Sequence, residues 1–152
     1  PYILHVHGWN METWEKDRFA ETMFKRLYWQ GYQGHFGSFR WPTRNGFEKY
    51  FAWQNIFTAP NHFDRSEFTA WKSGPALRSV LQGLAGRYDG SLFLTAHSMG
   101  NVVAGEALRV TTNAPFVTGY IAMQGAIPAH AYDATNPPPR IVPFQYEDNT
   151  PN

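Results

Sequence analysis

The chain has 152 residues, a formal net charge of +1 and no cysteine. A hydrophobic share of 43% and a charged share of 16% fit a globular domain and exclude an intrinsically disordered chain. The basic residues are scattered, so the sequence disfavours nucleic-acid binding and a polybasic membrane patch. The apolar runs are far shorter than the roughly 20 residues of a spanning helix, and we expect no integral membrane segment. Without cysteine there is no disulfide and no thiol nucleophile, while the localisation stays unknown.

Apolar runs of strand length alternate with helical patterns along the chain. Each run is aromatic, β-branched or apolar throughout, and turn formers bound it. Helical spacing is clear in the stripe of Leu77, Val80, Leu81 and Leu84. In chain order the predicted elements are a strand at Tyr2–Val6, a helix at Trp14–Gln30, a strand at Phe36–Trp41, a helix at Glu67–Ala85, a strand at Ser91–Ala96, a helix from just after Ser98 to Arg109 or Val110, and a strand at Gly119–Gln124.

This alternation predicts an α/β fold. Strands that alternate with helices form a parallel sheet with helices on both faces, so we expect a three-layer α/β/α arrangement with a mainly parallel sheet. The Thr43–Ser66 connection is long for such a unit and is predicted to form a cap or binding loop. The chain starts inside a strand pattern and ends in turn formers. We therefore expect residues 1–152 to be a single, truncated domain that associates with the rest of its parent chain.

The segment around Ser98 carries the candidate chemistry. An apolar strand ends just before this serine and a helix begins just after it, so the turn is tight and the residues two positions away must be small. These residues are Ala96 and Gly100. The turn lifts the Ser98 hydroxyl clear of the sheet and leaves the Met99 N–H at a helix N-terminus, where a developing oxyanion is favoured. Ser98 is the candidate nucleophile, and a serine that only caps the helix is the alternative.

A His-Gly pair follows the first strand. Gly8 lets the backbone approach a substrate, and the N–H of Trp9 is the candidate second oxyanion donor. His7 is expected to steady this loop. Trp9 and Trp41 are predicted to line a crevice at the carboxyl ends of the strands and to favour an apolar acyl group, with core packing as the alternative for each. His97 points away from the serine hydroxyl at such a turn, so we expect it to pack or to form a hydrogen bond instead of acting as the base.

Six short motifs lie in a specific order and spacing along the chain. They are Val6-His7-Gly8-Trp9-Asn10, Phe39-Arg40-Trp41-Pro42, Asp64-Arg65-Ser66-Glu67, Trp71-Lys72-Ser73-Gly74, Ala96-His97-Ser98-Met99-Gly100-Asn101 and Glu106-Ala107-Leu108-Arg109. Together they resemble the motifs of a family of bacterial α/β-hydrolases that are serine esterase- or lipase-like and mostly of unassigned substrate. The resemblance extends from about Ile3 to Tyr132.

The resemblance implies a partial α/β-hydrolase fold with a mainly parallel sheet. It also implies Ser98 as the nucleophile, with Met99 and Trp9 as backbone oxyanion donors. The chain departs from the pattern after its last predicted strand. Related proteins often carry an acidic loop there, whereas this sequence has Gln124-Gly125-Ala126 and no carboxylate before Asp133.

The order of a triad in this fold is serine, then an acid, then histidine. Downstream of Ser98 the sequence contains one histidine, His130, which comes too soon after the last predicted strand for a usual base. Asp133 has no histidine after it. We therefore expect the histidine, and with it the acid, to lie beyond Asn152, and we expect this polypeptide alone to hydrolyse esters poorly. His130 as base and Asp133 as acid are the alternatives.

The expected function is hydrolysis of carboxylic esters through an acyl-serine intermediate. The expected substrate is a small-molecule or lipid ester, and neither a cofactor nor a metal is expected, because the six histidines form no helical pair. A non-catalytic binding or scaffold domain that kept the fold and lost the triad is the alternative from another class. A peptidase or a thioesterase is a further alternative, which the turn at the serine does not separate from an esterase.

Overall fold

The structure is a computed structural model that describes residues 1–43, 62–109 and 116–127. The predicted strands and helices are confirmed, with most ends shifted by one or two residues. The second predicted helix differs most, since it starts at His62 instead of Glu67. The elements are β1 (Tyr2–Val6), α1 (Thr13–Trp29), β2 (His35–Phe39), α3 (His62–Ala85), β3 (Leu92–His97), α4 (Gly100–Arg109) and β4 (Gly119–Met123).

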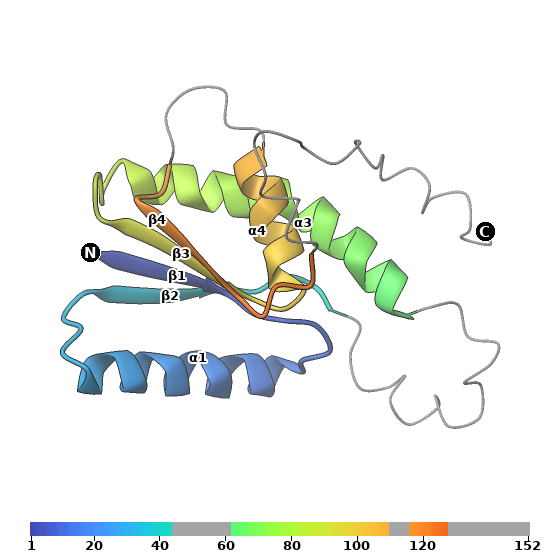
Figure 1. Ribbon diagram of the computed structural model, residues 1–152, viewed down its shortest axis with the longest axis horizontal. Coiled ribbons are helices and arrows are strands. Elements are labelled where there is room, and N and C mark those ends of the chain that lie inside the picture. Colours follow the sequence, from blue (N-terminus) through green and yellow to red (C-terminus); the bar gives the residue numbers. More distant parts are fainter. Residues whose placement is uncertain (44–61, 110–115, 128–152) are drawn as a thin grey trace.

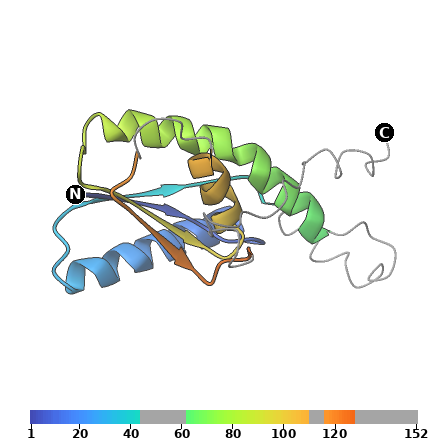
Figure 2. The same ribbon diagram turned by 45° about the horizontal axis from the view of Figure 1, so that its top comes forward.

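The four described strands form one sheet in the order β2-β1-β3-β4. All three strand pairs are parallel. Helix α1 covers one face of this sheet, and α3 and α4 cover the other (Figure 1). The view in Figure 2 shows the same separation, with α3 running along the sheet on the side opposite α1. The three-layer α/β arrangement expected from the sequence is therefore confirmed.

The main core lies between the sheet and the α3–α4 pair. β1 and β3 turn alternate side chains to this side, and Leu4, Leu94 and Ala96 are buried there. Leu77 and Leu81 of α3 are buried as well, as the four-residue spacing of apolar positions requires. The apolar members of the core cluster are Leu4, Val6, Trp41, Ala70, Leu77, Leu81, Leu92, Leu94, Ala96, Met99, Val102, Val103, Ala104 and Ala107.

Close contact between α3 and α4 depends on a glycine. A Cβ atom built on Gly74 would lie 2.6 Å from Glu106 Cγ and 3.2 Å from the Ala107 nitrogen. The first distance is far below ordinary van der Waals contact and the second is slightly below it, so a larger side chain would require Glu106 and the α4 backbone to shift. The contact fixes α4, whose first turn follows the candidate serine.

The face of the sheet under α1 is more polar. His5 is fully buried there, between the sheet and the Phe19 ring, whose centroid lies 5.3 Å from that of the imidazole. Its Nδ1 lies 3.0 Å from the Thr95 hydroxyl on the neighbouring strand. Lys16 of α1 is also buried, and its Nζ donates a hydrogen bond to the Trp41 carbonyl over 3.3 Å. None of the helices within the described ranges is both long and apolar enough to cross a membrane.

Candidate active site

Parallel strands bring three chain segments to one edge of the sheet. Val6 at the end of β1 pairs with Ala96 near the end of β3, so both strands end at the same level. The N–H of Ser98 donates to the carbonyl of Met123 at the end of β4 over 3.0 Å. Because the carboxyl ends of parallel strands share an edge, the loops after β1, β3 and β4 meet there. This edge holds the candidate nucleophile.

The backbone of Ser98 has a left-handed conformation, with φ of +50°. This conformation costs a residue with a side chain about 1–3 kcal/mol, and it marks the tight strand-to-helix turn that the sequence predicts. Among the described residues, the other non-glycine residues with positive φ are Asn10 and Gln124, and both lie in the loops that meet at the same edge. Strained backbone of this kind gathers at functional sites, which makes this edge the candidate active site.

Small residues surround the turn, for the steric reason expected from the sequence. A Cβ atom on Gly100 would lie 2.5 Å from the carbonyl oxygen of His7 and 2.7 Å from that of Val6. No side chain fits at that distance from backbone oxygens, so only glycine is accommodated. Ala96, on the other side of the serine, is fully buried. The Ser98 side chain itself is half-buried and lies before the first residue of α4, outside the regular helix.

The loop after β1 approaches the serine closely. A Cβ atom on Gly8 would lie 3.3 Å from Ser98 Cβ and 2.8 Å from His97 Nδ1. Glycine at this position lets the main chain that leads to Trp9 pass directly beside the candidate nucleophile. Within the described residues, hydrogen bonds at the turn use the N–H groups of Ser98 and Asn101 and leave that of Met99 without an acceptor.

His7 supports this loop from below. Its Nδ1 donates to the carbonyl of Gly8 over 2.8 Å, and its Nε2 accepts from the N–H of Trp41 over 3.2 Å. This pattern requires a neutral imidazole with its proton on Nδ1. Burial, the largest cause, lowers the pKa of His7 to about 4, and the nearby positive charge of Lys16 also lowers it. The expectation that His7 steadies the loop agrees with these contacts.

Trp41 belongs to the same support. Its indole is 1% exposed, stacks on the His7 ring at a centroid distance of 5.4 Å, and donates from Nε1 to the His7 carbonyl over 2.8 Å. With its surface used in this way, Trp41 does not line an open crevice, and the packing alternative describes it. Trp9 is half-buried and packs against the core cluster.

His97 points away from the serine, as expected. Its Nε2 donates to Gln124 Oε1 over 3.0 Å, and its ring stacks on Phe19 at 5.9 Å between centroids. Within the described part of the chain, no imidazole or carboxylate forms a hydrogen bond with the Ser98 hydroxyl. His130, Asp133 and most of the Thr43–Ser66 loop lie outside the described residues.

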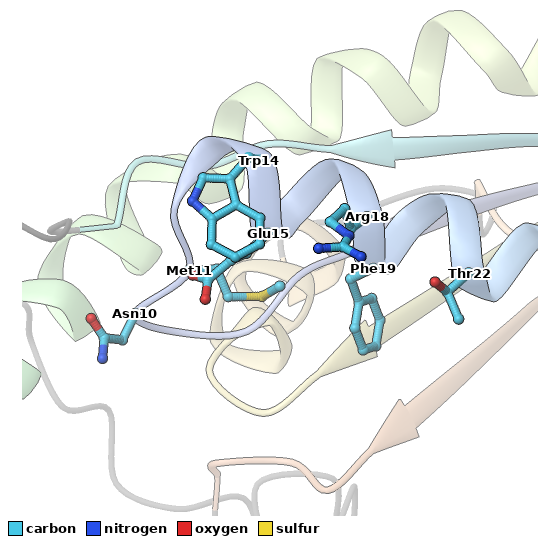
Figure 3. Close-up of a pocket in the computed structure, with 7 residues that line it drawn as sticks. All are labelled: Asn10, Met11, Trp14, Glu15, Arg18, Phe19 and Thr22. Carbon is cyan, nitrogen blue, oxygen red and sulfur yellow. The ribbon is translucent and has the colours of Figure 1, made fainter.

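A shallow hollow runs along α1 and the loop before it (Figure 3). Its volume is about 400 Å³, and Phe19, which stacks on His97, forms part of its wall. The wall combines apolar and polar side chains from α1 and from the loop before it: Asn10, Met11, Trp14, Glu15, Arg18, Phe19 and Thr22. Across residues 1–43, 62–109 and 116–127, no three His, Asp or Glu side chains gather as metal ligands would.

Sequence reasoning missed two residues of this edge. Asn101 is fully buried, and its side-chain amide donates to the carbonyl of Ser98 over 2.8 Å. Tyr120 of β4 donates from its hydroxyl to Asn101 Oδ1 over 2.6 Å. The sequence signal that could have identified Asn101 is its position: a polar amide in the first turn of a helix whose neighbouring residues are apolar.

A parallel sheet between helical layers, with a left-handed serine at the turn from a central strand into a helix, defines the α/β-hydrolase class of fold. The model of one family, described as alpha/beta hydrolase of unknown function (DUF900), matches residues 2–124, and the chain belongs to this family. Comparisons with curated proteins and with solved structures gave no match.

Proposed function

We propose that this chain carries the nucleophile of a serine hydrolase that acts on carboxylic esters. The observation that carries the proposal is the left-handed, half-buried Ser98 at the shared strand edge, next to Gly8. The Met99 N–H, which has no acceptor among the described residues, supports it further. A serine in this position can reach a carbonyl carbon that lies over the edge of the sheet.

The reaction would proceed through an acyl-serine. Ser98 Oγ attacks the ester carbonyl carbon as a general base removes the hydroxyl proton, and the negative oxygen accepts hydrogen bonds from the N–H groups of Met99 and Trp9. Collapse of this tetrahedral intermediate breaks the ester C–O bond, and the leaving oxygen takes the proton from the base and departs as the neutral alcohol. Water then attacks the acyl-serine and releases the carboxylic acid. No imidazole or carboxylate of the described residues forms a hydrogen bond with the Ser98 hydroxyl, so this base is not assigned to any of them.

The hollow along α1 supports an apolar group on the substrate. Its wall includes Met11, Trp14 and Phe19, and the Phe19 ring stacks on His97, the residue before Ser98 in the chain. A small-molecule or lipid ester with an acyl or alkyl chain would bury apolar surface there, and each buried CH₂ would contribute about 0.8 kcal/mol.

A fluorophosphonate probe tests the nucleophile directly, because it reacts covalently with activated serines. We expect the probe to attach to Ser98, and we expect slow hydrolysis of p-nitrophenyl esters by the same chain. Ser98→Ala should abolish both signals. Ser91→Ala is the matched control, because Ser91 lies at the opposite end of β3 and donates to the Tyr88 carbonyl. An unlabelled wild-type chain, or equal turnover in Ser98→Ala, would contradict the proposal.

A non-catalytic binding domain is the second candidate. It is favoured by the fact that no imidazole of the described residues forms a hydrogen bond with the Ser98 hydroxyl. This candidate predicts that apolar esters bind to the chain, for example as a perturbation of tryptophan fluorescence, while the probe leaves Ser98 unlabelled.

A further inference from the structure

Asn101 occupies an unusual place for a polar side chain. It is fully buried in the first turn of α4, between the strand-to-helix turn and the end of β4. Its Nδ2 donates to two main-chain carbonyls, that of Ser98 over 2.8 Å and that of Met123 over 3.3 Å. The amide therefore joins the nucleophile turn to the neighbouring strand.

The hydrogen bonds fix the orientation of this amide. Both carbonyl oxygens can only accept, so the NH₂ group must face them and Oδ1 must face the other way. On that side Tyr120 approaches to 2.6 Å, and its hydroxyl must donate. A buried network with every member satisfied is rigid, whereas the loss of one donor leaves a buried acceptor without a partner.

The network acts on the main chain of the candidate nucleophile. The Ser98 carbonyl also accepts from the N–H of Asn101 over 3.0 Å and from that of Ala126 over 3.2 Å. On the other side of the residue, the Ser98 N–H donates to the Met123 carbonyl, which is also an acceptor for the Asn101 amide. Strained backbone persists when the surrounding structure over-determines it, and these bonds supply that constraint.

We propose that Asn101 and Tyr120 are positioning residues for the nucleophile. They hold the left-handed Ser98 peptide against the end of β4, so that Oγ and the Met99 N–H keep a fixed direction toward a substrate. This inference rests on the proposed function of Ser98. Neither side chain needs to touch the substrate, because both act through the main chain of the serine.

Tyr120→Phe is the sharpest variant, since it removes one hydroxyl and keeps the ring. The matched control is Tyr32→Phe, which removes a hydroxyl that donates to the His35 carbonyl over 2.7 Å at the other end of the sheet. We expect Tyr120→Phe to slow fluorophosphonate labelling of Ser98 by about 10-fold, with kcat for p-nitrophenyl esters lowered and KM nearly unchanged. Tyr32→Phe should label within about twofold of the wild-type rate.

Amide hydrogen exchange supplies a second readout that does not depend on chemistry at the serine. Exchange of the Ser98 and Ala126 amides should be faster in Tyr120→Phe and in Asn101→Ala than in the wild type, and unchanged in Tyr32→Phe. If labelling and exchange both match the wild type in Tyr120→Phe, the positioning role is wrong while the proposed function stands. Faster exchange with unchanged labelling would show a purely structural network and would also overturn it. A wild-type chain that is not labelled at Ser98 contradicts the proposed function itself.

Discussion

The two faces of the sheet are built differently, although each strand contributes to both. Leu94 points toward α3 and α4 and is fully buried among apolar side chains. The next residue, Thr95, points toward α1 and bonds to the buried His5. The face under α3 and α4 is thus a packing layer, whereas the face under α1 contains polar groups next to the strand edge that holds Ser98. We therefore expect the folding stability to come mainly from the face under α3 and α4, and the pH dependence of that stability to come from the face under α1.

Leu94→Ala should produce the largest effect and tests the packing layer. The side chain is 0% exposed, so its removal leaves a cavity in addition to the lost burial. We expect the free energy of unfolding to fall by about 3 kcal/mol. Urea denaturation monitored by tryptophan fluorescence measures this change, and a loss below about 1 kcal/mol would show that the face is not tightly packed.

The second prediction concerns pH and the face under α1. Burial is the largest cause that lowers the pKa of His5 to about 4, and the electrostatic interactions with His7 and His97 lower it further. The unfolded chain, with a histidine pKa near 6.5, binds the proton more tightly than the folded chain. The contribution of neutral His5 to the free energy of unfolding is therefore fully present above about pH 6.5 and is lost as the pH falls toward 4.

His5→Phe isolates this contribution. Between pH 7 and pH 5 the wild type should lose about 2 kcal/mol more unfolding free energy than the variant, because the variant has no imidazole to protonate there. Urea titrations at the two pH values measure the difference. Equal losses in both proteins would mean that the folded state accepts a proton on His5, and the contrast between the faces would weaken.

Thr95→Val should have the smallest effect on the free energy of unfolding. It is compared with Leu94→Ala, the variant of the preceding residue on β3. The variant keeps the shape of the side chain and removes the hydroxyl that meets His5 Nδ1 at 3.0 Å. We expect a loss of about 1 kcal/mol at pH 7, since one buried hydrogen bond is broken. The same urea assay applies. A loss as large as that of Leu94→Ala would contradict the assignment of stability to the apolar face.

The sequence allowed the fold to be predicted wherever the signal was local. The strand Tyr2–Val6 is confirmed at both ends, because a short apolar run bounded by turn formers suits few other structures. The start of α3 was predicted at Glu67, whereas the helix begins at His62. Ser66 is buried inside this helix, where tertiary packing outweighs the weak helix propensity of serine.

The candidate site also contains features that local sequence predicts and features that it does not. The tight turn at Ser98 and the need for small residues at positions 96 and 100 follow from the geometry of a few adjacent residues, and both were predicted. The stacking of Trp41 on His7 and the bond from Tyr120 to Asn101 join residues 34 and 19 positions apart. Such contacts depend on the sheet order, which alternation of strands and helices does not specify.

The positive φ of Ser98 has a consequence for how this protein can change over time. The backbone there suits glycine better than any residue with a side chain, so the fold would gain stability if the hydroxyl were given up. Random substitution followed by selection for stability alone would remove serine from this position. Under the proposed function, the strain at Ser98 is a stability cost carried by the same few atoms that would perform the chemistry.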